Sequence, residues 1–548
     1  MVSKIVVKNK VENMIKKYNI KHDCRGMKTC EIINTILTDR GIEDINRFLN
    51  PTEDDLLPLD SLPNVHEAYE LLKEHIDKLN NIHILWDVDV DGITSGSIMH
   101  RYLNMLGVEC TSHINEGKAH GLLNQYLNRF ADADLIIIVD SLDKNCSAYC
   151  KLKEQNKDII ILDHHAVNPN VPYDDYVTLV TSQIDYDNPS LSGAGVVWKF
   201  CRYIDEQNKT NYADELFDLA ACGLCADMMN MTVMENRYIV SRGLEQINNL
   251  ALKKIIGSYE FNTTAISFSV APLINAANRM FKNQVAMQAF LCDDNKEVLE
   301  HIKELKKSRE GQNEEVERLM PYVNEQCQAQ INNKMIVVYI DSEYGIGGLL
   351  GNKLLEIYQR PVLVLKDCGD KYSGSMRAVG VDDFRKIILE SGLATSEGHE
   401  LAAGIDIPKD NMDAFTSYIE EELSHIETEV YVYADIQLDV NDITRNLIEQ
   451  IKTLDRLSGE GFKPIKIYVN GITSYDVSNF SNYKHLVIKP KDYLLLIKWN
   501  WRGSFDDMED NSIVEEELEI VATLDSGWLG RNFVLKAICD EINVRENF

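Results

Sequence analysis

Short apolar runs alternate with helix-like stretches through residues 79–294. Three of these runs, at 82–86, 135–140 and 158–163, consist mostly of Ile, Leu and Val. Apolar runs of this length, when amphipathic segments separate them, are typical of parallel strands that helices cover on both faces. The pattern therefore predicts an α/β domain built on a parallel sheet.

The remaining residues divide into four further segments. Residues 1–78 are polar and predict helices, and 295–330 predicts a long, solvated connecting helix with few core positions. A smaller α/β module is expected at 331–430. In 431–548, several short strands at close spacing predict a small β-rich barrel or sandwich.

The composition is that of an ordinary soluble protein with more than one domain. The chain has 548 residues, of which 45% are hydrophobic and 26% charged. No apolar run approaches the roughly 18 residues that a membrane span requires, and the N-terminus lacks the apolar core of a signal peptide. We therefore expect a cytoplasmic protein without membrane association, in which the twelve cysteines are reduced thiols.

The net charge is −31. This excess of acidic over basic residues argues against nucleic-acid binding by the whole surface, since phosphate contacts require Lys and Arg. A polyanionic substrate would have to be held by a local basic path and by metal ions.

Three carboxylates follow the first buried strand at every second position, in the stretch HILWDVDVDG: Asp87, Asp89 and Asp91. Alternation by two places side chains on one side of an extended segment, at the edge of the sheet where α/β proteins bind ligands. Carboxylates this close repel one another unless a cation lies between them. A solvated acidic turn is the alternative interpretation of this stretch alone.

Matching groups follow the other predicted strands and one helix. Asp140 ends the second run, Asp163, His164 and His165 end the third, and Asp227 ends an apolar helix-like stretch. Carboxylates with one or two imidazoles suit Mn²⁺ or Mg²⁺ better than a structural zinc site. A carboxylate that bridges two such ions is a standard device for phosphoester hydrolysis.

The stretches DVDVDG, VDS, LDHH and ADMM resemble the four motifs of the DHH phosphoesterase superfamily, and most closely its RecJ branch of single-strand-specific DNA exonucleases. The stretches LSGAGVVWKF, ENR and PLINAANRM are similar to flanking segments of that branch. In the second module, YGIGGLLGNKL, GSMRA and EGHELAAGI resemble the DHHA1 domain, and RLSGEGFKPIKIYV resembles the entry to an OB-fold. The resemblance covers nearly the whole chain in the expected order.

The resemblance implies roles for particular residues. His165 would face the scissile phosphate, Asp163 would orient a histidine, and Asp140 would bridge two metal ions. Asp87 would be a ligand or would orient one. The implied set of metal ligands is Asp87, Asp89, Asp91, Asp140, His164 and Asp227.

Substrate-binding residues are also implied. The positions that match the family's phosphate contacts are Arg279, Asn352, Lys353, Ser375, Arg377 and His399. Asn352 and Lys353 stand where the family usually has Ser-Arg, so a point charge replaces a fork-shaped donor. The C-terminal segment YKHLVIKPKDYLLLIKWNWRG interleaves Lys and Arg residues with aromatic residues, among them Trp499 and Trp501, as in OB-folds that stack single strands on aromatic rings. Aromatic side chains that pack in the core of a strand pair are the alternative.

The sequence thus predicts an exonuclease, dependent on Mn²⁺ or Mg²⁺, that degrades single-stranded DNA from the 5′ end to mononucleotides in repair or recombination. The direction follows from the resemblance alone. A DHH phosphodiesterase of short oligonucleotides or cyclic dinucleotides is the first alternative, and a non-catalytic DHH scaffold is the second. Candidate partners are a single-strand-binding protein and a helicase, in a bacterial cytoplasm or a phage-infected host.

Overall fold

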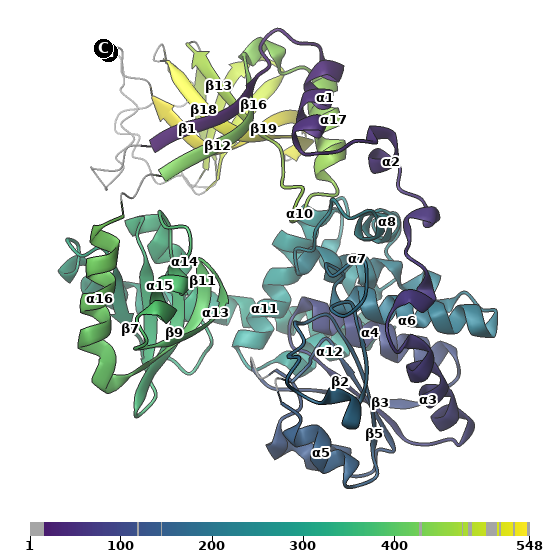
Figure 1. Cartoon of the computed structure of the whole chain (residues 1–548). Helices are drawn as coiled ribbons and strands as arrows, with labels where there is room; N and C mark the ends of the chain where they lie inside the picture. Colours follow the sequence, from purple (N-terminus) through teal and green to yellow (C-terminus); the bar gives the residue numbers. More distant parts are fainter. Residues whose placement is uncertain are drawn as a thin grey trace. The chain divides into compact units, whose positions relative to one another are not determined.

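The computed structural model describes residues 16–117, 120–143, 145–426, 430–473, 475–480, 485–499, 512–514, 517–529 and 532–544 (Figure 1). Internal contacts divide the chain into two compact units. The parallel-sheet unit comprises residues 44–315 and 456–463. The two-sheet unit comprises the described residues of 1–43, 316–455 and 464–548.

The parallel-sheet unit contains five strands, all parallel, in the order β3-β2-β4-β5-β6. Every residue of β2 and β4 is buried, as their unbroken apolar runs predict. The predicted α/β class is thereby confirmed. The strands are β2 Ile82–Trp86, β3 Cys110–Ile114, β4 Leu135–Val139, β5 Asp158–Asp163 and β6 Thr178–Thr181.

The strand order creates a switch point between β2 and β4. From β2 the chain moves outward to β3 on one side, and it then crosses back to β4 on the other side. In open α/β sheets, such a point leaves a crevice at the carboxyl ends of the strands, where ligands bind. The Asp-rich segments that follow β2 and β4 therefore lie at this crevice.

Helices cover the sheet, and α4, α6 and α7 pack against one another. Helix α8 ends at Gly243, and Asn249 caps a new helix, α9, by accepting a hydrogen bond from the Leu252 N–H. The principal helices are α3 Val65–Asp77, α4 Val90–Met105, α5 Ser147–Lys153, α6 Gly193–Asn208, α7 Phe217–Ala226, α8 Met234–Gly243, α9 Leu250–Ile256, α11 Ala271–Arg279 and α12 Asn283–Leu291.

The long charged segment forms one helix, α13 Asn295–Ala329, which contains Pro321. The prediction that it is solvated with few core positions is wrong for one side of the helix. Apolar residues spaced three and four apart on that side are buried, because this spacing places them on one face. They are Val298, Ile302, Leu305, Val316, Leu319, Val323 and Cys327.

The second module of the sequence forms a five-stranded mixed sheet with the order β10-β11-β9-β8-β7, in which only β7 and β8 are parallel. Apolar clusters pack on both of its faces. Its elements are β7 Ile336–Tyr339, α14 Gly347–Tyr358, β8 Val362–Asp367, β9 Lys371–Arg377, α15 Phe384–Glu390, β10 Thr395–His399, β11 Ala402–Pro408 and α16 Met412–Ser424.

The β-rich C-terminal prediction is confirmed, and the sheet reaches nine strands because it recruits the N-terminus. Residues 16–23, which were predicted to be helical, form strand β1 and pair in parallel with β12. The alternation of Tyr18 and Ile20 with polar residues favours a strand, but its partner lies some 400 residues away. The strands are β1 Lys16–Asp23, β12 Val430–Leu438, β13 Lys466–Ile472, β14 Tyr475–Phe480, β15 His485–Lys491, β16 Leu494–Lys498, β17 Ser512–Val514, β18 Leu518–Leu529 and β19 Asn532–Val544.

None of the helices in the described ranges has both the length and the apolar character that a membrane crossing demands.

Candidate metal centre

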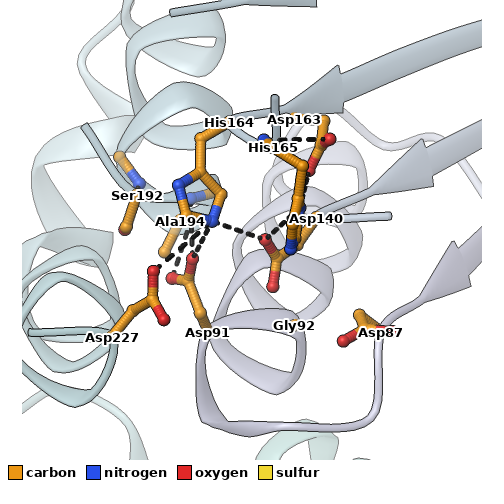
Figure 2. A network of polar contacts seen from close by, with 12 residues as sticks. Asp87, Asp91, Gly92, Asp140, Asp163, His164, His165, Ser192, Ala194 and Asp227 are labelled. Carbon is orange, nitrogen blue, oxygen red and sulfur yellow. Dashed lines mark hydrogen bonds and ion pairs between the residues drawn. The ribbon is translucent and has the colours of Figure 1, made fainter. Parts of the chain in front are cut away.

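The carboxyl ends of three adjacent strands bring the predicted acidic and imidazole groups together (Figure 2). Asp87 follows β2, and Asp140 follows β4 in a left-handed conformation, with φ of 56°. Asp163 is the last residue of β5, and His164 and His165 come directly after it. Because parallel strands end at one edge of the sheet, side chains that are far apart in sequence share one crevice.

The start of α4 supplies two more carboxylates. Asp89 caps the helix by accepting a hydrogen bond from the Gly92 N–H at 3.0 Å. Asp91, in the first turn, is buried and accepts hydrogen bonds from the backbone N–H groups of Gly193, at 2.6 Å, and Ala194, at 3.1 Å. The start of α6 therefore fixes the orientation of Asp91, since a helix N-terminus favours an anion.

The imidazole of His164 lies among three carboxylates, as Figure 2 shows. Its Nε2 lies 3.2 Å from Asp140 Oδ1, 3.5 Å from Asp227 Oδ2 and 3.7 Å from Asp91 Oδ2. Asp227 reaches this position because it ends α7. Oxygen and nitrogen donors from four separate elements thus converge on one small volume.

His165 is held by a different carboxylate. Its Nδ1 lies 2.8 Å from Asp163 Oδ1, and its backbone N–H donates to Asp163 Oδ2 at 3.2 Å. Although burial opposes protonation, this hydrogen bond raises the pKa of His165 to about 9. Burial likewise opposes ionisation of Asp163, yet the His165 hydrogen bond lowers the pKa of that carboxyl. The two residues form an Asp–His pair at the edge of the crevice.

Glycines leave room for the carboxylates. A Cβ at Gly193 would lie 2.4 Å from Asp140 Oδ1, and a Cβ at Gly223 would lie 2.2 Å from Asp91 Oδ1. Both distances are far below van der Waals contact. Two of the helices at this crevice can therefore approach the carboxylates only because these positions lack a side chain.

The acidic groups strongly oppose one another's ionisation. Burial, with repulsion from Asp87 and Asp91, raises the pKa of Asp89 to about 7. Burial, with repulsion from Asp91 and Asp89, raises the pKa of Asp227 to about 8. Burial also raises the pKa of Asp140 well above its ordinary value, with repulsion from the neighbouring aspartates adding to it. A cation among these groups would relieve the repulsion.

The donors fit divalent metal ions. Asp140 Oδ1 is buried and makes no hydrogen bond within the part of the chain that the structure describes, which suits an oxygen that binds a cation. Carboxylate oxygens with one or two imidazoles match the preferences of Mn²⁺ and Mg²⁺. Three groups have donor atoms that all lie within 4.8 Å of one another: Asp140, His164 and His165; Asp91, His164 and Asp227; and Asp87, Asp89 and Asp140.

The structure therefore brings together all six residues that the resemblance implied as metal ligands. Asp140 and His164 each belong to two of the three groups. Asp163 contacts His165, so it orients the imidazole that the resemblance placed at the phosphate. The metal-binding and catalytic roles of these residues stay predictions.

Four of the implied substrate-binding residues share one region of the mixed sheet. Arg377 Nε donates to Asn352 Oδ1 at 2.7 Å. Ser375 lies two residues earlier on β9 and faces the start of α14, where an added Cβ on Gly347 would lie 3.4 Å from its Oγ. His399, on β10, stands in register with Ala402 and thereby with Arg377, two strands away.

The other implied substrate-binding residues occupy separate positions. Lys353 is exposed on α14. In the parallel-sheet unit, Arg279 at the end of α11 donates to Gln312 Oε1 at 2.9 Å. The ring of Trp499 is 39% exposed and lies 4.9 Å from the ring of His485. Trp501 lies outside the described residues.

Sequence reasoning missed His120. Its Nδ1 lies 2.9 Å from Asp87 Oδ1, and its ring lies 5.0 Å from that of His165. It follows β3, an edge strand whose partly exposed residues show no apolar run. The one local signal is a glycine on each side, at 117 and 121, both with positive φ.

Comparison with known proteins agrees with this architecture. Residues 81–224 match the model of the DHH family, N-terminal domain. The chain is 28% identical over 458 residues to YorK of Bacillus subtilis (strain 168), and the alignment covers 76% of this chain and 79% of YorK. YorK is an SPbeta prophage-derived protein that is named as a putative single-strand DNA-specific exonuclease. It is 26% identical over 471 residues to the single-stranded-DNA-specific exonuclease RecJ of the same organism, over 80% of this chain and 58% of RecJ.

The fold is similar to the crystal structure of RecJ from Thermus thermophilus in complex with Mn²⁺, with a TM-score of 0.76 and 22% identity. That match covers 97% of this chain and 80% of the RecJ chain. At this identity the likeness shows the fold. Residues 81–224 thus match the DHH family's N-terminal domain, and the chain as a whole is similar to YorK and RecJ in sequence and to RecJ in fold.

Proposed function

We propose that this chain is an exonuclease, dependent on divalent metal ions, that hydrolyses the phosphodiester bonds of single-stranded DNA. The observation that carries the proposal is the convergence of five aspartates and His164 at the switch point of the parallel sheet. The names of YorK and RecJ, with which the chain aligns over most of its length, support single-stranded DNA as the substrate.

The proposed metal site consists of Asp87, Asp89, Asp91, Asp140, His164 and Asp227. Two Mn²⁺ or Mg²⁺ ions bound there would supply Lewis-acid polarisation of the phosphate group and activation of the attacking water. The chain's own contribution is to hold the donors in place before any ion binds. Asp91 is fixed by two backbone N–H groups, and Asp140 is confined by the neighbouring Gly193.

His165 is suited to contact the phosphate. With Nδ1 held by Asp163, its Nε2 lies on the opposite side of the ring, and 45% of its side chain is exposed. The hydrogen bond to Asp163 favours the protonated, positively charged imidazole. This imidazole would stabilise the negative charge that develops on the phosphate oxygens in the transition state.

The mixed sheet is proposed to hold the DNA backbone. Arg377, Asn352 and Ser375 lie together beside the glycine-rich start of α14, where backbone N–H groups favour phosphate. These local donors would let an acidic protein, with a net charge of −31, bind DNA. The negative charge on the rest of its surface would disfavour DNA binding elsewhere.

We further propose cleavage from the 5′ end with release of mononucleotides, in repair or recombination. The setting would be a bacterial cytoplasm or a phage-infected host, where a single-strand-binding protein or a helicase would expose the substrate.

The experiment that tests the function offers purified protein 5′-labelled and 3′-labelled single strands, the matching duplex, and a dinucleotide, with Mn²⁺ and again with EDTA. We expect mononucleotides to appear early from the 5′ label of single strands, and only with the metal. Cleavage confined to the dinucleotide would assign the protein to the small-substrate phosphodiesterases. If no substrate is cleaved with metal, a scaffold role replaces the enzymatic one.

A further inference from the structure

Two Asp–His pairs face each other across the edge of the crevice. In one, Asp163 Oδ1 lies 2.8 Å from His165 Nδ1, and in the other, Asp87 Oδ1 lies 2.9 Å from His120 Nδ1. The two imidazole rings are 5.0 Å apart, with an angle of 67° between their planes. The pairs come from different strand ends, so the fold places two similarly held imidazoles side by side.

The loop that carries His120 is anchored next to it. The Gly121 N–H donates to Ser141 Oγ at 2.8 Å, and the Gly121 carbonyl accepts from Asn115 Nδ2 at 2.8 Å. Both partners are buried, with 1% and 3% of their surface exposed. Ser141 also contacts Asp87 Oδ1, at 3.4 Å, so one hydroxyl group links the loop to the carboxylate that holds His120.

The other side of the loop is also anchored. Asn283 Nδ2, at the start of α12, donates to the Gly117 carbonyl at 2.8 Å. The ring of Phe281 packs so closely on Gly117 that an added Cβ would lie 2.7 Å from it. Gly121, next to His120, and Gly117, three residues before it, are therefore both fixed by hydrogen bonds to buried side chains.

His120 is oriented for contact with a ligand. Its Nδ1 faces Asp87, so its Nε2 lies on the opposite side of the ring, and 40% of its side chain is exposed. It belongs to none of the three groups of donors that converge on a cation among the described residues. An imidazole edge beside that of His165 suits the oxygens of a tetrahedral oxyanion better than it suits a metal ion.

We propose that His120 is a second phosphate-contacting residue, which binds the phosphate group of the substrate beside His165. This inference rests on the proposed phosphodiesterase function and names a further residue for it. Hydrogen bonds to ionised phosphate are among the stronger ones in proteins. Two imidazoles would thus share the oxygens of one phosphate group that the surrounding carboxylates would otherwise repel.

The test compares three substitutions of His120 with each other. The amide nitrogen of His120→Gln reaches the place of Nε2, so it keeps a donor for phosphate. The amide of His120→Asn reaches the place of Nδ1, so it keeps only the contact with Asp87. His120→Ala removes both, and His425→Ala, at an exposed position after α16, is the control.

The measurements are the binding of the mononucleotide dTMP to the Mn²⁺-loaded protein by calorimetry, the affinity for Mn²⁺ itself, the melting temperature, and kcat and KM on single-stranded DNA. We expect His120→Ala to weaken dTMP binding about 10- to 100-fold, as for one lost hydrogen bond to a charged group. Mn²⁺ affinity and melting temperature should stay as in the wild type. His120→Gln should recover much of the dTMP affinity, and His120→Asn little.

Three results would overturn the inference: dTMP affinity that is unchanged in His120→Ala, recovery by Asn in place of Gln, or a loss of Mn²⁺ affinity as large as the loss of dTMP affinity. The last two would mean that His120 only positions Asp87. If the wild type cleaves no DNA but binds dTMP through His120, the proposed function fails while the phosphate contact stands. If the wild type binds no dTMP, the phosphate contact fails, and the cleavage assay alone decides the proposed function.

Discussion

Asp91 Oδ2 lies 2.6 Å from the backbone nitrogen of Gly193, so the first turn of α6 holds a carboxylate of α4. The same glycine passes against Asp140, which belongs to a third element. One residue without a side chain therefore sets the distance between two proposed metal ligands.

Substituting Gly193 with Ala should disable the site without unfolding the protein. The new Cβ would lie 2.4 Å from Asp140 Oδ1, and the carboxylate must shift because the nearby helix backbone cannot. Displacement of a catalytic group by about 1 Å costs on the order of 100-fold in rate, so we expect at least that loss in kcat, together with weaker Mn²⁺ binding. Gly311→Ala in α13, whose Cβ would make one ordinary contact at 3.4 Å, is the control and should keep full activity.

Asp140→Asn should abolish metal-dependent cleavage and yet stabilise the metal-free protein. The asparagine keeps the shape of the side chain but removes one buried charge from a group of mutually repelling carboxylates. We expect the free energy of unfolding in EDTA to rise, measured by urea denaturation, because the amide cannot ionise beside Asp89 and Asp91. Retained cleavage in this variant would contradict the two-metal assignment.

The stability of the metal-free protein should fall as pH rises. The pKa values of Asp89 and Asp227 are about 7 and about 8 in the folded chain, against 3.8 as the ordinary value. The folded state therefore binds protons that the unfolded state has released, so the stability present near pH 4 is lost progressively up to about pH 8.

The measurement is the melting temperature in EDTA and in Mg²⁺ at pH 6 and pH 8. The stabilisation by Mg²⁺ should be larger at pH 8, because the ion no longer competes with protons. Asp227→Asn, which removes one of the two groups, should show a shallower fall in EDTA. A fall equally steep in that variant would assign the effect to the overall negative charge.

Arg377→Ala should weaken DNA binding and leave the metal site intact. Loss of one phosphate contact is expected to reduce affinity about 10-fold or more and to decrease the slope of log K against log salt by about 0.7 for single strands. Fluorescence anisotropy with a labelled single strand measures both. Lys371→Ala, on the same strand but paired with Asp406, should change neither.

Much of the parallel-sheet unit could be predicted because β2, β4 and β5 are buried on both faces, which requires unbroken apolar runs. Because parallel strands end at one edge of the sheet, the proximity of the acidic and imidazole residues that follow these strands could then be deduced from strand direction alone. Strands β3 and β6 escaped detection, since both are edge strands, β6 has four residues and β3 is partly exposed. His120 was missed for the same reason, because it follows β3 and can be placed beside the site only once β3 is recognised as a strand of this sheet.

Other features depend on distant pairing. Nothing near Asp91 in the sequence indicates that the N–H groups of Gly193 and Ala194, 102 and 103 residues away, would bind it. The buried side of α13 was underestimated because charged residues between its apolar positions dominate the sequence. The partner of β1 could not be found from the sequence, since local pattern specifies a strand but not its neighbour.

The pairing of β1 with β12 constrains the order in which the chain can fold. About 400 residues separate the two strands, and at roughly 5–20 residues per second synthesis of β12 follows that of β1 by about 20–80 s. Throughout this interval β1 has no partner strand to pair with, while the five-stranded parallel sheet can already assemble behind it. A fragment intended to carry the metal centre alone should therefore begin after residue 23, because earlier residues would bring an unmatched strand edge that favours aggregation.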